Sequence, residues 1–148
     1  MKALNIDWQI SPDEHLIIVT TGENLNAGDL HAYRAEVLMS GRYPGCRQLI
    51  DITSLDCSRL IYMDLMDEFV ACMNHSRNHL QGDRAALVAA TSSQQGMAAF
   101  LRSAFALSQQ EQAESPAALL MDVGVFTDIQ QARTWLTSDR SESCQACR

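Results

Sequence analysis

The sequence has no long apolar run and few basic residues, and each shortage excludes a class of protein. No stretch approaches the roughly 18 consecutive apolar residues that a membrane-spanning helix needs. The 11 Lys and Arg residues are outnumbered by 18 Asp and Glu residues, which gives a net charge of −7. An acidic chain repels phosphate backbones and anionic membrane surfaces. We therefore expect neither nucleic acid nor a membrane among its partners.

A secretory leader and a disulfide framework are also missing. Residues 1–15 contain one Lys but neither an apolar core nor a small-residue cleavage site, so we read no signal peptide. The five cysteines are odd in number and unevenly spaced: Cys46, Cys57, Cys72, Cys144 and Cys147. That pattern favours reduced thiols in a chain large enough to have its own core. The predicted location is the cytoplasm.

Nucleotide and metal motifs are absent from the sequence as well. There is no G-x-G-x-x-G string, no P-loop and no pair of CxxC knuckles. We therefore predict no cofactor and no metal. Internal repeats and low-complexity runs are not seen either, and the chain is most simply one domain over residues 1–137 with a polar, flexible tail over residues 138–148.

Hydrophobic patterning predicts an α/β domain with the order ββαβαβαβα. Apolar alternation or continuous β-branched runs mark the strands, expected at residues 4–10, 16–21, 47–52, 85–90 and 123–126. The first two strands share a short turn and should pair antiparallel. Each later pair is joined by a helix, which gives parallel pairing. The expected result is a single mixed sheet with an antiparallel first strand at its edge.

Several local features of the helices can be predicted too. Asn26 should cap the first helix, and Thr127 with Gln130 should form a capping box for the last. Residues 109–116 read as a flexible polar connection. A helix from Cys57 or Ser58 to about residue 79 should bury a stripe made by Met63, Met66, Phe69 or Val70, and Met73. A buried face is also expected on the next helix, made by Met97, Phe100, Leu101, Ala104 and Phe105.

Four strings of the sequence resemble a known family. They are VTTG at the end of the hairpin, LIDIT in the central strand, RAALVAATSSQQGMAAF and VFTDIQQARTWL. Their order and spacing are similar to those of the SpoIIAA-like group of the STAS-like fold, over about residues 4–136. The resemblance implies a regulatory or partner-binding domain rather than an enzyme.

The turn after the central strand is where this resemblance bears on function. In the anti-sigma-factor antagonists of the fold, this turn carries Asp-Ser followed by a small residue, and phosphorylation of the Ser switches partner binding. Here the string is LDCSRL: Asp56 matches the Asp, and Cys57 stands where the phosphorylated Ser would be. Ser58 comes one position late and Arg59 replaces the small residue. These departures speak against a phospho-switch and leave partner binding as the implied role.

The residues themselves also point to this turn, with alternatives open. We predict a partner- or ligand-binding surface made by Thr53, Ser54, Asp56, Cys57, Ser58 and Arg59. A helix N-terminus attracts anions and lowers a thiol pKa, so a reactive Cys57 is a rival reading, although no His lies near it in sequence. The plainest alternative is that Asp56 or Ser58 only caps the helix.

Other clusters suggest further sites. Hydroxyl-rich turns at residues 20–22, 53–54 and 91–93 should meet at the carboxyl ends of the parallel strands, where they could bind a small ligand or simply cap helices. Zinc ligands could come from one helix face and the tail, namely Cys72, His75, His79, Cys144 and Cys147, but we read these as a solvated helix end and a frayed tail. The acidic group Asp64, Asp67 and Glu68 reads as a solvated face.

The sequence thus predicts a non-enzymatic regulatory or protein-interaction domain of STAS-like type. Its partner is expected to be a protein, with a second copy of the chain as one candidate. The alternative is a domain that binds a small apolar or anionic ligand.

Overall fold

A computed structural model of the chain describes residues 5–59, 62–79, 83–112 and 121–138. These residues form one five-stranded sheet in the order β1-β2-β3-β4-β5. The strands are β1 (Ile6–Ser11), β2 (Leu16–Thr21), β3 (Arg47–Asp51), β4 (Arg84–Val88) and β5 (Asp122–Phe126). β1 pairs antiparallel with β2, and all later pairs are parallel. The predicted mixed α/β sheet is confirmed.

Helices connect the parallel strands and follow the last one. The α-helices of the described chain are α1 (Ala27–Glu36), α2 (Tyr62–His79), α3 (Ser92–Gln112) and α4 (Ile129–Thr137). Short 3-10 helices occur at η1 (Pro12–Glu14), η2 (Leu38–Ser40) and η3 (Cys57–Arg59). No helix among these described segments has the length and apolar character to cross a membrane.

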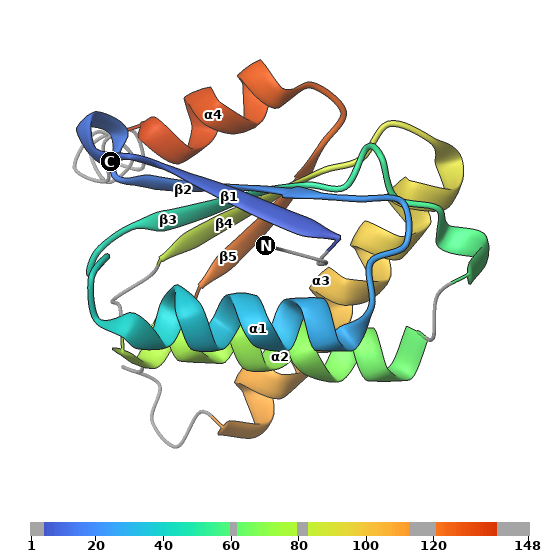
Figure 1. The fold of residues 1–148 in the computed structure, drawn as a ribbon, viewed down its shortest axis with the longest axis horizontal. Helices are drawn as coiled ribbons and strands as arrows, with labels where there is room; N and C mark the ends of the chain where they lie inside the picture. Colours follow the sequence, from blue (N-terminus) through green and yellow to red (C-terminus); the bar gives the residue numbers. More distant parts are fainter. Residues whose placement is uncertain (1–4, 60–61, 80–82, 113–120, 139–148) are drawn as a thin grey trace.

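The three connecting helices lie on one face of the sheet, and α4 lies on the other (Figure 1). This follows from the strand order, because successive right-handed crossovers that always step to the next strand put every connecting helix on the same side. Most of the core therefore lies between the sheet and α1, α2 and α3. On the opposite side α4 packs on a smaller cluster around Leu49 and Ala86.

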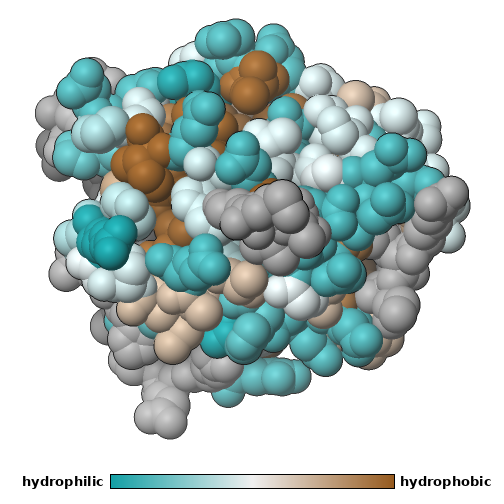
Figure 2. All heavy atoms as spheres, viewed as in Figure 1, coloured by the Kyte–Doolittle hydropathy of each residue, from teal (hydrophilic) through white to brown (hydrophobic). Residues whose placement is uncertain are grey.

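Some apolar surface on the α4 side of the sheet remains exposed to solvent. Ile18 and Ile129 pack against the smaller cluster but are only partly buried. In Figure 2 hydrophobic atoms gather near α4 and the β1–β2 hairpin. A helix of only nine residues covers this side, which explains the incomplete burial.

A chain of buried polar side chains links β3 to the helices below it. The Tyr33 hydroxyl of α1 donates to Gln48 Oε1 of β3 at 2.6 Å, and Gln48 Nε2 donates to Ser76 Oγ of α2 at 2.8 Å. All three residues are at most 1% exposed. Buried polar groups are costly unless they are paired, so these bonds fix how α1 and α2 sit under the central strand.

Two arginines, at the amino ends of β3 and β4, hold the C-terminus of α4 against the sheet. Arg47 pairs with Asp83 at 2.7 Å and also donates to the carbonyl of Leu136. Arg84 donates to the carbonyl of Trp135 at 2.8 Å, and its guanidinium lies over the Trp135 ring. Cations at a helix C-terminus satisfy the last carbonyls and interact favourably with the helix dipole.

Some local expectations are wrong. Met63 is 60% exposed, whereas Phe69 and Met73 of the same predicted stripe are buried, and Leu65 and Cys72 complete the buried face of α2. Phe100 is 36% exposed and leaves the predicted buried face of α3. The cap of α4 is Asp128, whose side chain accepts from the N–H of Gln130, and Thr127 is not the cap.

The expected polar connection at residues 109–116 is helical in its described part, because α3 continues to Gln112. Gln109 is buried and bonds both backbone groups of Met121, with Nε2 donating at 3.0 Å and Oε1 accepting at 2.8 Å. Residues 113–116 lie outside the described residues, as do Leu4 and residues 139–148 of the predicted tail.

A surface ion pair ties α4 to the hairpin. Arg133 Nε donates to Glu14 Oε2 at 2.9 Å, and the Ser11 hydroxyl donates to Glu14 Oε1 at 2.9 Å. The hydrogen bonds from Arg133 and then from Ser11 lower the pKa of Glu14 from 4.5 to about 2. The folded state therefore favours the carboxylate over the protonated acid.

Glu14→Gln should reduce the free energy of unfolding at neutral pH. The difference in free energy of unfolding between wild type and variant should become smaller as the pH is lowered. Because the folded-state pKa is depressed, the contribution of Glu14 is present above pH 4.5 and is lost as the pH falls through about 2. Urea unfolding of wild type and variant across this range measures the difference. In Arg133→Met, an NMR titration should find the pKa of Glu14 displaced from about 2 toward 4.5. A gap between wild type and Glu14→Gln that stays constant with pH would contradict this account.

Candidate functional site

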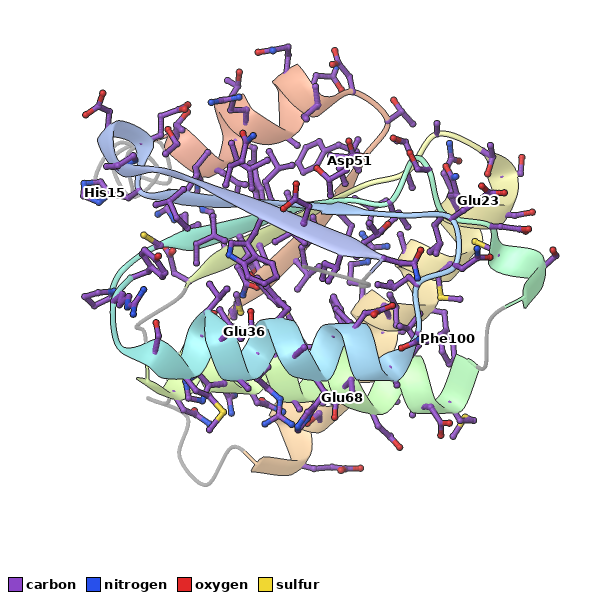
Figure 3. The ribbon with its side chains drawn as sticks, viewed as in Figure 1. His15, Glu23, Glu36, Asp51, Glu68 and Phe100 are labelled. Carbon is purple, nitrogen blue, oxygen red and sulfur yellow. The ribbon has the colours of Figure 1, made fainter. Side chains whose placement is uncertain are left out.

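The hydroxyl-rich turns meet at the carboxyl ends of the parallel strands, as predicted. The N–H of Ile52 donates to Val88 O at 2.9 Å, and the N–H of Asp56 donates to Glu23 O at 3.0 Å. The turns that follow β2, β3 and β4 are thereby joined through their backbones. Figure 3 shows Glu23 and Asp51 toward the same end of the sheet. This end carries the predicted binding turn.

One buried side chain, Gln94, holds this edge together. Its Nε2 donates to Thr53 O at 2.9 Å and to Leu55 O at 3.1 Å. Its Oε1 accepts from the N–H groups of Ala90 and Thr91, at 2.9 and 3.1 Å. Gln94 is 4% exposed, and both its donors and both its acceptor sites are used. A single amide thus fixes the turn after β3 against the turn after β4.

The start of α3 is arranged around the same residue. Thr91 Oγ1 accepts from the N–H of Gln94 at 3.1 Å, which confirms the predicted hydroxyl cap of this helix. The cap and the amide together satisfy the donors that a helix N-terminus leaves open. The sequence singled out Thr91 but missed Gln94. The available signal was Thr followed three residues later by Gln, the spacing of a capping box.

Side chains of the predicted turn divide into buried anchors and exposed polar groups. Leu55 and Cys57 are 5% and 7% exposed. Thr53, Ser54 and Ser58 are exposed, and Asp56 is half-buried. Arg59 belongs to η3, and its side chain lies outside the described residues. The backbone is therefore fixed from below, while the side chains of Thr53, Ser54 and Ser58 are exposed to solvent.

Two carboxylates close small turns along this segment. Asp51 Oδ1 accepts from the N–H of Thr53 at 2.9 Å and from its hydroxyl at 2.6 Å. Asp56 Oδ1 accepts in the same way from Ser58, at 3.0 and 2.6 Å. Asp and Ser or Thr side chains commonly make such local bonds at turns and helix starts. Asp56 therefore caps the 3-10 helix η3, whereas the long helix that was expected to begin at Cys57 or Ser58 is described from Tyr62, as α2.

Cys57 lies in the apolar core, next to the carboxylate of Asp56. Burial raises the pKa of its thiol, and the negative charge of Asp56 raises it further. A reactive thiol needs a lowered pKa, since the thiolate is the attacking species. A raised thiol pKa does not favour the prediction of Cys57 as a catalytic residue.

Two of the residues considered as zinc ligands, Cys72 and His75, contact backbone carbonyl groups instead. Cys72 is buried, its Sγ lies 3.9 Å from Leu30 O, and burial raises its pKa to about 12. His75 Nε2 lies 3.0 Å from Leu38 O. The side chain of His79 and both Cys144 and Cys147 lie outside the described residues. Within the described chain no group of three metal-binding side chains comes together.

A groove that the sequence did not predict lies between α2 and α3. It has a volume of about 450 Å³ and is lined mainly by apolar groups, among them Met66, Val70, Phe100, Ala104 and Leu107. No residue of the three hydroxyl-rich turns lines it. The small-ligand hypothesis placed its site among those turns and the Met-rich helix, and this groove meets only the helix. Leu107, apolar but off the core face of α3, was the sequence signal for it.

No family model, curated protein or solved structure matches the chain. The resemblance to the STAS-like fold stays a prediction. The α/β architecture with its sequential strand order rests on the structure itself.

Gln94→Leu should destabilise the protein by at least about 2 kcal/mol, because four backbone groups in two turns lose their partner. Urea unfolding measures the loss, and hydrogen exchange should quicken at the N–H groups of Ala90 and Thr91. Gln110→Leu is the matched control: Gln110 is exposed on the same helix, and its replacement should stay within about 0.5 kcal/mol of wild type. Equal losses for the two variants would remove Gln94 from its proposed role.

Alkylation of Cys57 by iodoacetamide should show a midpoint above the ordinary thiol value of 9.0. Mass spectrometry of the Cys57 peptide separates it from the other cysteines. Asp56→Asn should lower the midpoint only partly, because burial is the larger cause. A midpoint below the ordinary value would revive the reactive-cysteine reading.

Proposed function

We propose that the chain is a non-enzymatic regulatory or protein-interaction domain of STAS-like type. It binds a protein partner through the turn 53–59 and the first residues of α2. The partner is another protein or a second copy of the chain. Free, buried Cys46, Cys57 and Cys72 support a reducing, cytoplasmic setting for this interaction.

The observation that carries the proposal is that this turn combines a fixed backbone with exposed polar side chains, two of which are themselves held by Asp51 and Asp56. Gln94 and the N–H of Asp56 hold the backbone at the carboxyl edge. Thr53, Ser54 and Ser58 are exposed on it. A surface ordered before binding loses little conformational freedom when a partner arrives, which favours affinity.

The adjacent helix adds an apolar group to this polar surface. Met63 lies in the first turn of α2, four residues after Arg59, and is 60% exposed. Protein interfaces commonly combine an apolar centre, in which Met is enriched, with a polar rim. An exposed Met that follows ordered hydroxyl residues closely in the sequence supports recognition of a protein better than catalysis, and the raised pKa of Cys57 supports the same conclusion.

Ser54→Arg should weaken partner binding by about tenfold or more, because a long cation replaces a small hydroxyl in the proposed contact. The test is affinity purification from the native host with quantitative mass spectrometry. Ser54 is exposed, so the variant should keep the wild-type melting temperature.

Thr134→Arg is the matched control, since Thr134 is an exposed hydroxyl residue on α4, across the sheet from α2. It should recover the wild-type partners. Recovery of the same partners, in the same amounts, by Ser54→Arg and wild type would show that the turn is not the interface.

A further inference from the structure

The groove between α2 and α3 has an apolar floor that remains open to solvent. Met66 and Val70 contribute from α2, and Phe100, Ala104 and Leu107 contribute from α3. Leu107 is 60% exposed and Phe100 is 36% exposed. In Figure 3 Phe100 is seen beside the N-terminal half of α2.

Exposed large apolar side chains concentrate on these two helices. In the described chain they are Met39, Met63, Phe100 and Leu107, and three of the four belong to α2 or α3. Two of them, Phe100 and Leu107, line the groove itself, and grouped exposed apolar residues mark an interaction site where single ones do not. The groove is therefore the strongest candidate for a second binding surface.

The rim of this groove is acidic. Asp67 of α2 and Glu111 of α3 both line it and both are exposed. Asp64 is exposed one turn before Asp67 on α2. Glu68, by contrast, faces α1 and pairs with Arg34 at 3.3 Å, so it was wrongly grouped with the solvated acids. Carboxylates around an apolar floor attract a partner that has basic residues beside an apolar stripe.

The length of the groove suits a helix. From Phe100 to Glu111 the α3 wall extends about 16 Å, at 1.5 Å per residue. The apolar stripe of an amphipathic helix, at positions i, i+3, i+4 and i+7, covers about 10 Å. Two to three turns of a partner helix can thus lie along the wall with their apolar side chains over Ala104, the smallest apolar residue of the floor.

We propose that the α2–α3 groove binds an amphipathic helix of a partner protein, with an apolar stripe flanked by Lys or Arg. The apolar side chains of that helix lie over Met66, Val70 and Leu107, and its cations face Asp67 and Glu111. This surface shares no residue with the turn 53–59, so either site can fail its test while the other stands.

The test uses a synthetic peptide of about 16 residues with Leu at i, i+3, i+4 and i+7 and Lys at the flanking positions. Fluorescence anisotropy with the full chain measures its affinity. A scrambled peptide destroys the stripe, and a Glu-for-Lys peptide reverses the charge. Both should bind about tenfold more weakly than the parent or worse, and added salt should weaken the parent.

Variants of the chain then locate the site. Leu107→Glu, and the pair Asp67→Lys with Glu111→Lys, should each weaken parent-peptide binding by about tenfold or more. All three residues are exposed, so the fold should be retained, which a thermal melt checks. Met39→Glu and Asp13→Lys are controls of matched type outside the groove and should bind like wild type. NMR shift changes in wild type should centre on Met66, Val70 and Ala104.

Three outcomes would overturn the proposal. One is no saturable binding of the parent peptide, and another is equal binding of all three peptides or of all the variants. The third is a wild-type dimer, seen by sedimentation, that Leu107→Glu separates while the peptide does not bind. That result would assign the groove to a second copy of the chain.

Discussion

The carboxyl edge of this sheet depends on one amide. Gln94 bonds the carbonyls of Thr53 and Leu55 and the N–H groups of Ala90 and Thr91. Loops after adjacent parallel strands carry backbone groups that have left the sheet ladder and must be satisfied elsewhere. A side chain with two donors and two acceptor sites can do this for two loops at once, and burial makes each bond harder to exchange for water. The position of the turn 53–59 therefore follows from α3 as much as from β3.

The same economy of buried amides recurs elsewhere in the domain. Gln48 joins α1, β3 and α2, and Gln109 bonds both backbone groups of Met121 at the entry to β5. Each of these glutamines is at most 7% exposed. Apolar packing brings helices to the sheet without fixing their position along it, whereas a buried hydrogen bond tolerates little sliding. Apolar packing and buried hydrogen bonds together fix the helices relative to the sheet, so the side chains on the surface of these elements also hold defined positions.

The difference between local apolar patterns and long-range hydrogen bonds explains what could be predicted from the sequence. Strand positions and pairing followed from local apolar runs and from helix-length connections, and the Asn26 cap followed from its residue type at the start of a helical pattern. The structure adds that Asn26 and Asp29 form a reciprocal capping box. The Thr91–Gln94 spacing indicated the local half of the role of Gln94, but its bonds to Thr53 and Leu55 span 41 and 39 residues and those of Gln109 span 12, which no local pattern specifies. Met63 was wrongly predicted to be buried, because the unbranched Met side chain is compatible with either face of a helix. The buried face of α2 is set by Leu65 and Phe69. The groove was not predicted because it forms only where α2 and α3 pack against each other, and their contact is not visible in either segment of the sequence alone.

Helix α2 connects the two proposed surfaces. Its first turn follows the binding turn and presents Met63, while Met66 and Val70, on its next turns, form one wall of the groove. Its position is fixed by the Gln48–Ser76 bond on the sheet side and by the Arg34–Glu68 pair beside α1. Two contacts on one rigid helix keep a constant separation, so a partner that engages one surface is presented to the other at high effective concentration. Two individually weak contacts then suffice for a stable complex, and neither has to supply a catalytic group or a cofactor site.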